Sequence, residues 1–137
     1  MGHLYIKRIY EEQGADDGYR ILIDRLWPRG VKKEAANIDE WAKEVTPSTE
    51  LRKWFAHKEE RFDTFREEYE DELNNNPDAH TFAKHCQELQ QKDNVTLLYG
   101  AKSHTYNHAV ILREWILDQQ REIAHPAPPS FDGAPSQ

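Results

Sequence analysis

Three short stretches of the chain have the hydrophobic pattern of β-strands. Residues 3–10 alternate between apolar and polar side chains, whereas residues 19–23 and 95–99 are mostly aliphatic and aromatic. Short apolar runs bounded by polar or glycine-containing segments favour strands over helices. We therefore expect three strands at these positions.

Between the second and third of these strands, apolar residues recur every three or four positions, which predicts helices. Ser48 or Thr49 would begin one helix, and Asn76 followed by Pro77 would begin another. A short helical turn is also expected at 38–43, with Asn37 as its cap. The predicted helices are a segment from about 49, the ranges 59–74 and 107–121, and a segment from 77 with Phe82, Ala83, Cys86 and Leu89 on one face.

A strand that is followed by helices before the next strand favours parallel pairing. We therefore expect an α/β fold with a small, mainly parallel sheet of three or four strands, flanked by helices and carrying a helical insertion. At 137 residues the chain suits one domain, which we place at 1–124. Residues 125–137 are rich in Pro, Ala and Ser and are expected to form a flexible tail.

Two polar loops follow the second and third predicted strands, at 24–30 and 100–108. The carboxyl ends of parallel strands meet at one edge of a sheet, so these loops are expected to lie together. Both loops contain cations. The second loop leads into the last predicted helix, whose N-terminus attracts anions. This pattern predicts a site for a small phosphate or carboxylate ligand, with Asp24 and His108 as candidate proton-handling residues. The candidate ligand-binding residues are Arg25, Trp27, Arg29, Arg52, Tyr99, Lys102 and Asn107.

Structural roles for the same residues stay open. Arg25 and Arg29 could instead form ion pairs with Asp39, Glu40 or Glu44 and hold the loop in place. The tryptophans at 27, 41, 54 and 115 are expected mainly to pack, because aromatic side chains dominate protein cores.

Composition limits the partners. The formal net charge is −7, which argues against general binding to nucleic acid, although residues 24–33 carry four basic side chains and one acidic. A single cysteine fits a reducing compartment, and no apolar run approaches the roughly 20 residues that span a bilayer. The start of the chain lacks the pattern of a signal peptide, so we expect a cytoplasmic protein without a membrane role. No motif indicates a cofactor or a metal.

Two function classes fit these patterns. The first is an enzyme or binding protein that acts on a small anionic molecule. The second is a protein-interaction or regulatory module, which would use the tryptophan-rich middle and the acidic helix at 59–74.

Three motifs carry a family resemblance: GYRILIDRLWPRG at 18–30, WAKEVTPSTELRKWF at 41–55, and VTLLYGAK with NHAVIL between 95 and 112. Together they resemble the YeaO-like branch of domain-of-unknown-function family 488, over about residues 4–117. The resemblance implies a small cytosolic α/β protein. It implies no established activity, cofactor or catalytic residue.

Overall fold

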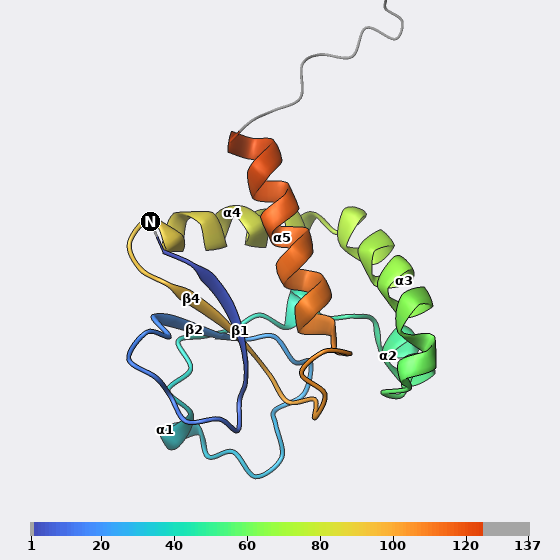
Figure 1. Cartoon of the computed structure of the whole chain (residues 1–137), viewed down its shortest axis with the longest axis horizontal. Helices are drawn as coiled ribbons and strands as arrows, with labels where there is room; N and C mark the ends of the chain where they lie inside the picture. The colour runs from blue at the N-terminus through green and yellow to red at the C-terminus, as the bar shows by residue number, and fades with distance from the viewer. Residues whose placement is uncertain (1, 125–137) are drawn as a thin grey trace, which may run out of the picture.

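A four-stranded parallel sheet lies at the centre of the computed structural model, which describes residues 2–124 (Figure 1). The strand order is β1-β4-β2-β3. The α/β class and the small parallel sheet are therefore confirmed. The predicted tail at 125–137 lies outside the described residues. The strands are β1 (Leu4–Arg8), β2 (Tyr19–Leu22), β3 (Glu40–Trp41) and β4 (Val95–Tyr99).

The helices follow the predicted periodicity, and two of the predicted caps are present. The Ser48 hydroxyl accepts the backbone N–H of Leu51 at 3.2 Å, and the Asn76 side chain accepts that of Asp78 at 3.0 Å. Both bonds satisfy N–H groups that the first helical turn leaves free. The helices are α1 (Lys33–Ala36), α2 (Thr49–Phe55), α3 (Phe62–Asn74), α4 (Pro77–Gln90) and α5 (His108–Ala124), with short 3-10 segments at Lys43–Val45 and Glu59–Arg61.

One face of the sheet carries the main core. The register of β4 with its two neighbours pairs Val95 with Leu4 of β1 and with Tyr19 of β2. Every second residue after these three therefore points to the same face of the sheet. That face packs on α2 to α5, whereas α1 lies apart from the other helices (Figure 1). The opposite face has a smaller core, in which Ile9, Leu22 and Leu98 pack under Trp27, Val31, Ile38 and Trp41.

The helical turn predicted at 38–43 is wrong. Glu40 and Trp41 form β3 and pair with Ile21 and Leu22 of β2. The Trp41 indole N–H also donates to the carbonyl of Asp24 at 2.6 Å. Pairing with the sheet edge outweighed the weak local helix signal. Asn37 ends α1 in the left-handed region, with φ 49°, and does not begin a helix.

Candidate functional site

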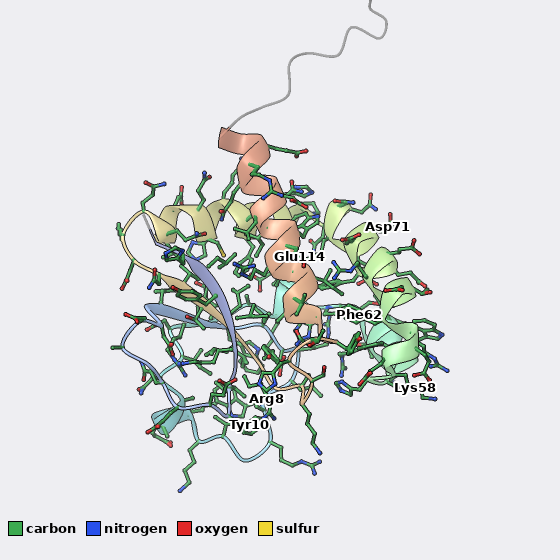
Figure 2. All side chains as sticks on the ribbon, in the orientation of Figure 1. Arg8, Tyr10, Lys58, Phe62, Asp71 and Glu114 are labelled. Carbon is green, nitrogen blue, oxygen red and sulfur yellow. The ribbon has the colours of Figure 1, made fainter. Side chains whose placement is uncertain are left out.

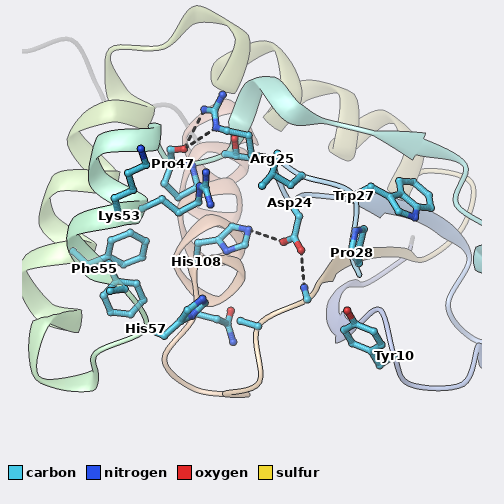
Figure 3. Close-up of a pocket in the computed structure, with 18 residues that line it drawn as sticks. Tyr10, Asp24, Arg25, Trp27, Pro28, Pro47, Lys53, Phe55, His57 and His108 are labelled. Carbon is cyan, nitrogen blue, oxygen red and sulfur yellow. Dashed lines mark hydrogen bonds and ion pairs between the residues drawn. The ribbon is translucent and has the colours of Figure 1, made fainter. Parts of the chain in front are cut away.

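A cavity of about 500 Å³ lies at the carboxyl ends of β1, β2 and β4 (Figure 3). Its wall combines residues that follow three strands: Tyr10 after β1, Asp24 after β2, and Gly100 after β4. The end of α2 and the start of α5, with His108, complete it. The two loops predicted to meet at one edge of the sheet therefore do meet there.

Asp24 joins the two loops. Its Oδ2 accepts the backbone N–H of Gly100 at 2.9 Å, and its Oδ1 lies 3.5 Å from Nε2 of His108. A Cβ on Gly100 would lie 2.8 Å from the same carboxylate, so the absence of a side chain there permits this contact. Nε2 of His108 is also 2.7 Å from the carbonyl oxygen of Ile23. The structure thus brings together the two candidate proton-handling residues.

Burial favours the neutral form of both groups. Burial raises the pKa of the Asp24 carboxyl, although His108, the Gly100 N–H, Arg52 and His57 oppose the rise. Burial lowers the pKa of the His108 imidazole, against the attraction of Asp24 and the carbonyl of Ile23. Two neighbouring titratable groups with shifted pKa values therefore line the cavity, as acid–base chemistry or proton-linked binding requires.

Acidification should destabilise the fold through His108. Its pKa is lower in the folded chain than in the unfolded chain, so the unfolded chain takes up the proton first as pH falls. This contribution to stability is complete above the ordinary histidine value of about 6.5 and is lost below it. In urea unfolding at several pH values below neutral, His108→Gln should lose less stability than the wild type.

The matched control for this prediction is His104→Gln. The His104 side chain is 68% exposed, so its replacement should leave the pH profile unchanged. Parallel profiles for the wild type and His108→Gln would contradict the assignment.

Three cationic side chains line the cavity: Arg25, Arg52 and Lys53. Nε and Nη2 of Arg25 donate to the carbonyl of Pro47 at 3.3 and 3.1 Å. Nε of Arg52 is buried and has no hydrogen-bond partner within the described chain. Within residues 2–124, none of the three cations forms an ion pair with a carboxylate. The cavity therefore presents three cations without a carboxylate partner at ion-pair distance among the described residues, although Asp24 lines the same cavity and interacts electrostatically with Arg52.

The ion pairs considered for the loop arginines are not formed within the described residues. Asp39 accepts the backbone N–H of Arg20, and Glu40 accepts from Tyr19 and lies 2.7 Å from His85. The alternative prediction, that Arg25 and Arg29 hold the loop through ion pairs with these acids, is therefore wrong. Arg25 does hold the loop, through the carbonyl of Pro47.

The structure divides the seven predicted ligand-binding residues into two groups. Arg25, Trp27, Arg52 and Asn107 line the cavity, whereas Arg29, Tyr99 and Lys102 are outside its lining. Arg29 and Lys102 are exposed, and Tyr99 is buried in the core with 1% exposure. Asn107 also caps α5, since its side chain accepts the N–H of Val110 at 3.0 Å.

The tryptophans pack as expected, with one exception. Trp27 and Trp41 meet edge to face at 5.3 Å between ring centroids, and the Trp27 indole donates to the carbonyl of Val31 at 2.7 Å. Trp115 is 5% exposed in the core. The prediction that Trp54 packs in the core is wrong. Its side chain is 40% exposed, and the Arg61 guanidinium lies 5.1 Å from its ring centroid.

Three residues with titratable side chains line the cavity but were not among the predicted site residues: Tyr10, Lys53 and His57. His57 reaches the cavity because Ala56 and His57 adopt φ values of 48° and 58°, which turn the chain sharply after α2. Residues other than glycine seldom adopt positive φ, so this turn could not be predicted from the residue types. Adjacent strained residues of this kind concentrate at functional sites.

The described part of the chain has no features that favour metal binding, a reactive cysteine or a membrane-spanning helix. No cluster of three or more His, Cys, Asp and Glu side chains in residues 2–124 has an arrangement that could hold a metal ion. Cys86 is buried, and burial raises the pKa of its thiol, which keeps it in the unreactive protonated form. Over the same residues, no helix combines the length and apolar character needed to cross a bilayer.

Comparisons with known proteins confirm the resemblance found in the sequence. The DUF488-N3i family, described as "Inactive DUF488-N3 subclade", matches residues 3–132. The chain is 46% identical to the uncharacterized protein YeaO of Escherichia coli (strain K12) over 114 residues, which cover 83% of this chain and 96% of that protein. It is 37% identical to the uncharacterized protein Rv3073c of Mycobacterium tuberculosis (strain ATCC 25618 / H37Rv) over 109 residues, covering 80% and 89%. No solved structure matches the chain at a significant level.

Proposed function

This chain belongs to the DUF488-N3i family, and we propose that it binds a small organic anion, bearing a phosphate or a carboxylate, in the cavity at the carboxyl ends of β1, β2 and β4. One observation carries the proposal. Arg25, Arg52 and Lys53 line the cavity, and within the described chain no carboxylate forms an ion pair with any of them.

Arg52 has the clearest need for an anionic partner. A buried donor without an acceptor costs about 1–3 kcal/mol, and more where the group is charged. A phosphate or carboxylate in the cavity would supply the missing acceptor for Nε of Arg52. The net charge of −7 does not prevent this, because salt screens distant charges beyond about 8 Å.

Binding is favoured over catalysis. The subclade is described as inactive, and the Asp24–His108 pair suits a proton-linked binding site as well as it suits acid–base catalysis. The interaction module considered from the sequence has no comparable support, since the acidic side chains of α3 form an ordinary solvated face of an amphipathic helix.

A thermal-shift screen tests the proposed function. We expect at least one anion among inorganic phosphate, sugar phosphates, nucleoside monophosphates and small carboxylic acids to raise the melting temperature by several degrees. A ligand at 100 times its dissociation constant stabilises the fold by about 2.7 kcal/mol. Sodium chloride at equal ionic strength is the control for general salt effects.

Variants separate the cavity from the surface. Arg25→Gln with Arg52→Gln should abolish the shift, whereas Lys102→Gln, which changes an exposed residue outside the lining, should preserve it. If no anion exceeds the chloride control, the proposed function is wrong.

A further inference from the structure

The cavity is much larger than its cationic part requires. Its volume of about 500 Å³ falls within the range of sites for drug-sized ligands, roughly 300–1,000 Å³, whereas an inorganic anion occupies a small fraction of that space. Figure 3 shows Lys53 and His57 on one side of the Asp24–His108 pair, with Tyr10 and Pro28 on the other. We call the end with Lys53 the cationic end, although Phe55 also lies there, and the end with Tyr10 and Pro28 the apolar end.

Tyr10 is the main residue at the apolar end. It is 47% exposed, yet its hydroxyl donates to the carbonyl of Arg29 at 2.8 Å. The guanidinium of Arg8 also lies 4.9 Å from the ring centroid, and Figure 2 shows the two side chains together at this end of the sheet. An exposed ring that is already fixed loses little conformational entropy when a ligand covers it.

Trp27 is less suited to this role. Its indole N–H is bonded to Val31, its ring packs against Trp41, and Nζ of Lys33 lies 5.5 Å from its ring centroid. Leu26, at 65% exposure, adds apolar surface to the wall of the cavity.

The cationic end favours a phosphate over a carboxylate. Three cations and the N-terminus of the 17-residue α5 contribute to the cavity wall, against one carboxyl group, Asp24, whose pKa burial raises. A dianion gains more than a monoanion from such a field, and arginine binds phosphate through paired N–H groups.

We infer that the ligand is a monophosphate of a planar ring system, similar in size to a nucleoside monophosphate, with the phosphate at Arg25, Arg52 and Lys53 and the ring stacked on Tyr10. This inference rests on the proposed function. Stacking of one ring on an aromatic side chain strengthens binding by about tenfold.

Isothermal titration calorimetry with three phosphates tests the inference: inorganic phosphate, ribose 5-phosphate and a nucleoside 5′-monophosphate. We expect the nucleoside monophosphate to bind about tenfold more tightly than ribose 5-phosphate. Tyr10→Ala should remove this difference without weakening ribose 5-phosphate. Tyr10→Phe keeps the ring and should retain the difference although it loses the bond to Arg29.

Tyr5→Ala is the matched control, since Tyr5 is 40% exposed on β1 and does not line the cavity. It should leave all three affinities unchanged. If ribose 5-phosphate and the nucleoside monophosphate bind equally, or if Tyr10→Ala weakens both alike, the ring site is wrong and the anion site stands. If no phosphate binds, this inference fails, and the response to small carboxylic acids in the thermal-shift screen decides whether the proposed function stands.

Discussion

Arg52→Gln should weaken the binding of inorganic phosphate by at least about tenfold, because a hydrogen bond to a charged group contributes about 1.5–3 kcal/mol. Arg29→Gln should leave the affinity within about twofold, because Arg29 is exposed and lies outside the cavity lining. Each substitution removes one guanidinium group. Arg52 lies inside the cavity lining, and Arg29 lies outside it. Calorimetric titration of phosphate into each variant makes the comparison.

The stability of the unliganded variants separates a binding role from a structural one. Nε of Arg52 has no partner within the described chain, so Arg52→Gln removes a buried donor that destabilises the unliganded fold. We therefore expect its melting temperature without phosphate to equal or exceed that of the wild type, as is common when a binding residue is replaced. A large drop in that temperature, with phosphate affinity unchanged, would show that Arg52 is structural.

Arg20→Met should lower the free energy of unfolding by about 3 kcal/mol, because it breaks a buried ion pair. The Arg20 side chain is 3% exposed and pairs with Asp17. It also donates to the carbonyls of Ala36 at 3.0 Å and Asn37 at 3.1 Å, and so fixes the loop that carries α1. Without Arg20, these acceptors lose their donor in the interior, and Asp17 keeps only part of its charge compensation. Urea unfolding measures the change.

Lys7→Met is the control for the Arg20 prediction. Lys7 pairs with the same carboxylate at 2.8 Å, but its side chain is 21% exposed, and partly exposed pairs contribute about 0–1 kcal/mol. Equal losses from the two substitutions would mean that burial does not distinguish the pairs.

The hydrophobic pattern predicted most of the regular structure because that structure depends on local spacing. The apolar run at 95–99 is β4, and the helix start at Asn76-Pro77 is present in α4. The short pieces around 33–45 were not predicted. The two residues of β3 form a strand only because β2 lies beside them.

For the site, the order of strands and helices along the chain was enough to predict that the two loops meet and that Asp24 lies near His108. Parallel strands joined by helices must end at the same edge of the sheet, whatever their side chains. Which cations face the cavity was decided only by the tertiary structure. Arg29 and Lys102 are in the predicted loops but outside the cavity, while Lys53 and His57 come from the end of α2, through a turn with two positive φ values. Side-chain direction in a loop depends on backbone angles that distant packing imposes, and those angles have no periodic signal in the sequence.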